Sequence, residues 1–149
     1  MVIGGGSGGL ASAQRAAEYG ANVAVIEQAP LGGTCVNVGC VPKKVMWYAA
    51  QHTSFHKLAA DYGFDIKIKS HDWAQLKKKR DAYIKRLNGI YERNLKARNI
   101  QLIRGPAKFK NQSTVTVNDI DYSSQKIVIA TGGKPIVPEI SGGKLGIDS

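Results

Sequence analysis

Short apolar runs and longer helical repeats alternate along this chain. Runs rich in β-branched residues predict short strands, and apolar residues spaced three or four apart predict helices. We expect strands over residues 2–3, 21–26, 100–103, 114–117, 120–122 and 126–130, and helices over 10–19, 41–58 and 73–97. Residues 52–71 are low in pattern and predict the end of a helix followed by a loop. This order of elements predicts an α/β fold, in which the run over 126–130 is a buried strand.

The long helix over 73–97 has a clear start and two distinct faces. Asp72 stands where a helix N-cap is expected. The apolar stripe consists of Trp73, Leu76, Tyr83, Leu87, Ile90 and Leu95, while lysines and arginines fill the other faces. The stripe predicts packing against a sheet or a partner subunit, and the basic faces predict contact with solvent.

The chain has 149 residues and a formal net charge of +10, which is unevenly placed. Residues 67–110 carry fourteen bases and three acids, whereas residues 1–42 carry one base and two acids. A basic segment can bind nucleic acid, but this one lies on a predicted helix without a recognisable binding fold, so we expect no nucleic-acid partner. No apolar run is long enough to span a membrane. For the location we expect the cytoplasm, with an organelle as the alternative.

A glycine-rich loop lies between the first strand and the first helix. Gly4, Gly6 and Gly9 fit the pattern G-x-G-x-x-G, and Glu27 follows 18 residues after the last of them. Such glycines allow a tight turn, close approach of the backbone to a pyrophosphate, and close helix–strand packing. An acid after the second strand suits the unphosphorylated ribose of FAD or NAD. The loop therefore predicts a dinucleotide site.

Both cysteines lie in one stretch with small, turn-forming neighbours. Cys35 and Cys40 are five residues apart, and Pro42 suits the first turn of the helix that follows. A helix N-terminus and the charges of Lys43 and Lys44 both favour a thiolate at Cys40. We interpret the pair as a redox-active disulfide, with two ordinary thiols or half of a metal site as alternatives. No metal is expected, because the three histidines do not stand at zinc-ligand spacing from the cysteines.

Two motifs together resemble one enzyme family. Gly4–Gly9 combined with Gly32–Lys44 resembles the FAD-dependent disulfide reductases, among which are the glutathione, trypanothione, thioredoxin and mercuric reductases. Val45–Ala49 and Arg80–Tyr91 resemble the glutathione reductases most closely. The resemblance implies a Rossmann-like FAD-binding domain of three layers, with a parallel sheet and a small antiparallel meander, that is incomplete here.

The resemblance also implies roles for single residues. Cys35 would exchange with the disulfide substrate, Cys40 would stack over the flavin as the charge-transfer thiolate, and Lys43 would stand beside the isoalloxazine. The expected cofactor contacts are Gly4, Gly6, Ser7, Gly8, Gly9, Glu27, Thr34, Cys35, Lys43, Ala107, Thr131 and Gly132. The expected substrate contacts are Ser7, Gln14 and Tyr91.

The resemblance covers a part of the family's enzymes, which are about three times longer. It implies an FAD domain over 1–134, a linker over 135–149 toward an NADPH domain outside this chain, and a homodimer. The implied reaction is NADPH-dependent reduction of glutathione disulfide, with little or no turnover by these 149 residues alone. Trypanothione reductases have an acid and a tryptophan on the first helix, where this chain has Ala11 and Gln14. Glutathione reductases usually have arginine where this chain has Gln14. The alternatives are a related disulfide reductase of the trypanothione or thioredoxin type and a non-catalytic FAD-binding redox module.

Overall fold

The computed structural model describes residues 1–147. Its strands are β1 (Val2–Ile3), β2 (Ala24–Glu27), β3 (Gln101–Arg104), β4 (Lys108–Phe109), β5 (Thr114–Val117), β6 (Ile120–Ser123) and β7 (Val128–Ile129). Its helices are α1 (Ser7–Glu18), α2 (Gly33–Asn37), α3 (Cys40–Leu58) and α4 (Trp73–Ala97), with 3-10 turns η1 (Ala59–Tyr62) and η2 (Gly143–Leu145). The α/β prediction is confirmed.

The strands form two sheets. A parallel sheet has the order β3-β2-β1-β7, with Val2 opposite Val25 on one side and Val128 on the other. An antiparallel meander has the order β4-β5-β6. Asn118 and Asp119 connect β5 to β6 with positive φ angles of 48° and 65°, as expected of a two-residue hairpin turn.

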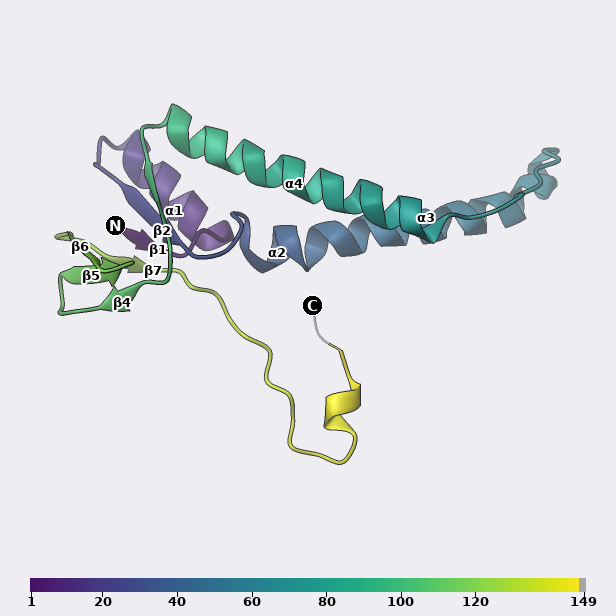
Figure 1. The fold of residues 1–149 in the computed structure, drawn as a ribbon. Coiled ribbons are helices and arrows are strands. Elements are labelled where there is room, and N and C mark those ends of the chain that lie inside the picture. Colours follow the sequence, from purple (N-terminus) through teal and green to yellow (C-terminus); the bar gives the residue numbers. More distant parts are fainter. Residues whose placement is uncertain (148–149) are drawn as a thin grey trace.

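The parallel sheet is the middle of three layers. Neighbouring residues of a strand point to opposite faces. Val25 therefore packs with Leu10 of α1 and Leu95 of α4, whereas Ile26 packs with Val115 and Val117 of the meander. The predicted three layers, with a parallel sheet and a small antiparallel meander, are thus confirmed (Figure 1).

The strand over 126–130 was predicted to be buried, and this prediction is wrong. β7 lies at the edge of the parallel sheet, where Val128 is 42% and Ile129 66% exposed. Its apolar composition reflects β propensity and not burial, because β1 covers one side of β7 and no described strand covers the other.

The helices α3 and α4 form a long arm that extends away from the sheets (Figure 1). Helix α4 begins and ends where the sequence predicts, and the Asp72 carboxylate accepts a hydrogen bond from the Gln75 N–H at 2.9 Å. The segment 52–71 ends α3, forms η1 and continues as a loop, which confirms the prediction. None of the helices in residues 1–147 combines the length and apolar character that crossing a membrane needs.

After β7 the chain leaves the sheet as an extended segment that carries η2 (Figure 1). Residues 135–147 lie within the predicted linker, whose last two residues, 148–149, are outside the described part of the chain.

Candidate nucleotide and disulfide site

The glycine loop brings the N-terminus of α1 to the carboxyl edge of the parallel sheet. Gly4 adopts a φ of +109°, and its N–H donates to the Ile26 carbonyl at 2.9 Å. Gly6 is the N-cap of α1 and has no side chain that could cap the helix. The first-turn N–H groups and the positive end of the helix dipole are therefore available to an anion such as a pyrophosphate.

Gly9 allows α1 to pack directly on the turn at Gly4. A Cβ atom at position 9 would lie 1.8 Å from the Gly4 carbonyl oxygen and 3.4 Å from a methyl group of Val2. This contact supports the prediction that Gly9 serves close helix–strand packing. Gly9 was also an expected cofactor contact, but it is not among the residues that line the cleft described next.

A cleft of about 1090 Å³ opens in front of this helix terminus. It is lined by the glycine loop, the end of β2, α2 and the turn after β7. The predicted cofactor contacts among its lining residues are Gly6, Ser7, Gly8, Glu27, Thr34, Cys35, Thr131 and Gly132. Residues more than 120 positions apart in sequence therefore meet in one cleft, as the resemblance implied.

A smaller cavity of about 160 Å³ shares Glu27, Gln28 and Thr131 with the cleft. Ala107 and Gly4 also line it. The predicted contact Ala107 thus lies in a cavity that adjoins the cleft at Glu27, Gln28 and Thr131.

Glu27 holds together the two turns that flank the cleft. One carboxylate oxygen accepts a hydrogen bond from the Gly5 N–H at 2.6 Å, and the other accepts from the Ala29 N–H at 2.7 Å. Each oxygen keeps a further lone pair, so the carboxylate can also accept hydrogen bonds from ribose hydroxyl groups.

The two cysteines are present as thiols on neighbouring helices. Cys35 lies in α2 and lines the cleft, while Cys40 is the first residue of α3. The hydrogen bond between them, with burial as a smaller cause, raises the pKa of Cys35, and the charge of Lys43 opposes this weakly. Cys40 and Lys43 are not lining residues of the cleft and lie beside it at the start of α3.

The predicted substrate contacts meet in a separate pocket of about 240 Å³. Ser7, Gln14 and Tyr91 line it together with Leu10, Ala11 and Gly32. The Gln14 amide donates to the Leu10 carbonyl of its own helix at 3.1 Å. Ser7 lines both this pocket and the cleft, so the two hollows adjoin.

Two asparagines that were not among the predicted site residues join the cysteine stretch to α4. The Asn88 amide donates to the Asn37 side-chain oxygen at 2.9 Å and to the Leu31 carbonyl at 2.7 Å. Asn37 lies in the motif Gly32–Lys44 and Asn88 in the motif Arg80–Tyr91, and their place in these motifs was the signal by which the sequence could have identified them.

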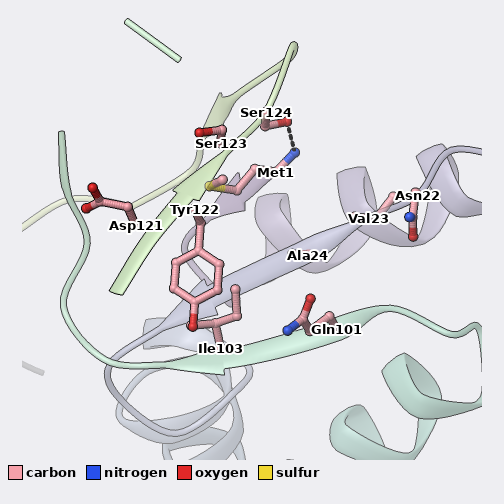
Figure 2. Close-up of a pocket in the computed structure, with 10 residues that line it drawn as sticks. All are labelled: Met1, Asn22, Val23, Ala24, Gln101, Ile103, Asp121, Tyr122, Ser123 and Ser124. Carbon is pink, nitrogen blue, oxygen red and sulfur yellow. Dashed lines mark hydrogen bonds between the residues drawn. The ribbon is translucent and has the colours of Figure 1, made fainter. Parts of the chain in front are cut away.

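A further hollow of about 320 Å³ lies between the parallel sheet and β6, away from the cysteines. Figure 2 shows Tyr122 and Ile103 side by side there, with the Met1 ammonium group donating to the Ser124 hydroxyl. None of the predicted site residues lines this hollow.

Comparisons with known proteins agree with this geometry. The family model of the pyridine nucleotide-disulphide oxidoreductases matches residues 1–149. A glutathione reductase of Yarrowia lipolytica is 52% identical over 163 aligned positions, which cover 100% of this chain and 35% of that protein. A glutathione reductase of Schizosaccharomyces pombe is also 52% identical, over 158 positions that cover 34% of its length.

A solved structure of a flavoprotein disulfide reductase is also similar to this chain. The HOCl-induced flavoprotein disulfide reductase RclA of Escherichia coli, in its Cu(II) complex, superposes with a TM-score of 0.76 and 31% identity. The match covers 95% of this chain and 29% of that one. The chain therefore spans about a third of the length of the relatives it matches.

Proposed function

Because this chain belongs to the pyridine nucleotide-disulphide oxidoreductase family, we propose that its complete protein is a flavoprotein disulfide reductase. The proposed reaction is the reduction of glutathione disulfide by NADPH, through FAD and the Cys35–Cys40 pair. The observation that carries the proposal is that Ser7 lines two neighbouring hollows. One is a cleft of dinucleotide size that Cys35 also lines, and the other is a pocket that Gln14 and Tyr91 line.

The residues of the cleft fit FAD. The uncapped start of α1 would hold the pyrophosphate, Glu27 would hold a ribose, and Ala107 would stand beside the adenine. Bound FAD would supply the two electrons that NADPH delivers for opening the Cys35–Cys40 disulfide.

The reduced pair then exchanges with the substrate. Deprotonated Cys35 attacks one sulfur of glutathione disulfide, forms a mixed disulfide, and releases one glutathione thiolate that takes up a proton. Cys40 as thiolate attacks the Cys35 sulfur, releases the second glutathione, and restores the protein disulfide. The backbone supports this second attack, because the Gly39 N–H beside Cys40 donates to the carbonyl of Thr34, the neighbour of Cys35, at 2.7 Å.

The proposal includes several features outside the described residues. NADPH would bind in a further domain reached through the linker over 135–149, and the protein would act as a homodimer in the cytoplasm. The relatives' threefold greater length supports a further domain. Residues 1–149 alone would show little or no turnover.

The test is NADPH oxidation that depends on glutathione disulfide, measured with the protein as encoded, including any residues beyond these 149. Cys35→Ser and Cys40→Ser should each reduce the rate to background, whereas Ser54→Ala, on the exposed side of α3, should not. FAD binding without any disulfide reduction would indicate a non-catalytic redox module. Preference for trypanothione disulfide would contradict the proposed substrate.

A further inference from the structure

Two asparagine side chains join the long arm to the turn that carries Cys35. Asn88 lies in the middle of α4, and Asn37 is the last residue of α2, 51 positions earlier. The Asn88 amide nitrogen donates to the Asn37 oxygen at 2.9 Å and to the Leu31 carbonyl at 2.7 Å. These contacts tie α4 directly to the cysteine stretch.

The nitrogen of Asn37 continues the network into the turn before α2. It lies 3.2 Å from the Pro30 and Leu31 carbonyl oxygens and 2.9 Å from that of Gly33. An amide nitrogen has two hydrogens, so these three contacts include a shared one. The two side chains thus hold the turn and both ends of α2, and Cys35 lies at the middle of that helix.

Helix α2 depends on such support because it has five residues. A single helical turn is unfavourable by itself, since it fixes several backbone angles for few hydrogen bonds. Its N-cap is Gly32, which has no side chain to accept a capping bond. The asparagine network therefore replaces the stabilisation that length and capping give to other helices.

Cys40 is held differently. It begins α3, a helix of 19 residues, and its connection to α2 runs through the Gly39 N–H, which donates to the Thr34 carbonyl at 2.7 Å. A displacement of α2 would consequently move Cys35 relative to Cys40. The distance between the two sulfurs then depends on how firmly α2 is held.

We infer that Asn37 and Asn88 are positioning residues that favour the Cys35–Cys40 disulfide by holding α2 against α4. The inference rests on the proposed redox role of the cysteine pair. Preorganisation raises the effective concentration of one thiol at the other, so loss of the network lowers the equilibrium constant for closing the disulfide. With two hydrogen bonds lost, we expect a fall of about five- to tenfold.

The experiment measures this equilibrium without turnover. The protein as encoded is equilibrated in mixtures of glutathione and glutathione disulfide, without NADPH, according to protein dithiol + glutathione disulfide ⇌ protein disulfide + 2 glutathione. Free thiols are then alkylated and counted by mass spectrometry. The variants are Asn37→Ala, Asn88→Ala, the double variant, and Gln75→Ala as a matched control that removes an exposed amide from α4.

Both single variants should lower the equilibrium constant about five- to tenfold, and Gln75→Ala should leave it unchanged. The double variant should lower the constant by less than the product of the two single effects, because the two side chains share one hydrogen bond and their effects are not additive. An unchanged constant in Asn37→Ala and Asn88→Ala, with or without a lower Tm, overturns the inference. A normal wild-type disulfide without glutathione disulfide reduction refutes the proposed function and leaves the inference standing.

Discussion

Replacing Gly9 by alanine tests the glycine loop, because the new methyl group has no space. Its Cβ would lie 1.8 Å from the Gly4 carbonyl oxygen and 2.9 Å from the Gly4 carbonyl carbon. Contacts of real Cβ atoms do not fall below 3.0 Å, so α1 would have to move away from the turn by about 1.2 Å. The clash is with backbone, which cannot rotate aside as a side chain does.

We expect Gly9→Ala to lower the free energy of unfolding by about 3 kcal/mol or more, at the upper end of overpacking costs. For a chain of this size the Tm should fall by about 6–12 °C. The gain in helix propensity from glycine to alanine, about 1 kcal/mol, works in the opposite direction and is too small to compensate.

Gly8→Ala is the matched control on the same helix. Apart from its chain neighbours and the nearby backbone of its own helix, no atom of the described residues lies within 4 Å of the Cβ that would be added at Gly8. This variant should be neutral or more stable by up to about 1 kcal/mol. Urea denaturation and thermal unfolding, both without added FAD, separate packing from ligand binding. If Gly9→Ala unfolds within about 1 kcal/mol of Gly8→Ala, the packing argument is wrong.

Three further measurements address charges. Glu27→Gln should weaken FAD binding about tenfold or more in a fluorescence titration, because hydrogen bonds to a charged acceptor contribute roughly 1.5–3 kcal/mol; unchanged affinity would remove the ribose assignment. The hydrogen bond with Cys40 raises the pKa of Cys35, so the alkylation rate of Cys35 should reach half its maximum at a higher pH than that of a free cysteine. The variant Cys40→Ala should shift this midpoint to lower pH. The hydrogen bond from Lys110 lowers the pKa of Asp121, so the stability that wild type has over Asp121→Asn should be present above pH 3.8 and disappear as the pH falls through the lowered pKa. A stability difference that persists in acid would contradict this assignment.

Local pattern predicted those elements whose signals lie within a few residues. Helix α4 is the best example, because Asp72 caps it and apolar residues recur from Trp73 to Leu95, with a gap at Lys79 and Arg80. The hairpin at Asn118 and Asp119 is equally local. Helix α2 was missed because five residues that begin with glycine give no helical period. The position of β7 was missed because apolar composition does not distinguish an edge strand from a central one.

The candidate site was predicted through resemblance more than through local pattern. Ser7 and Tyr91 line one pocket although 84 residues separate them, and periodicity does not encode that meeting. The contact between Asn37 and Asn88 spans 51 residues and depends on how α4 crosses α2. Such contacts follow from tertiary packing, which a single sequence does not display.

The hydrogen bonds of Glu27 affect how binding at this site should be interpreted. Its carboxylate already joins the Gly5 and Ala29 backbone groups before any ligand arrives. A ribose would therefore meet an acceptor whose position is already fixed, and little conformational entropy would remain to be lost there. Shortening the side chain, as in Glu27→Asp, would keep the charge and lose the reach to these N–H groups. Charge and preorganisation at this carboxylate can thus be measured separately by comparing the affinities of Glu27→Asp and Glu27→Gln.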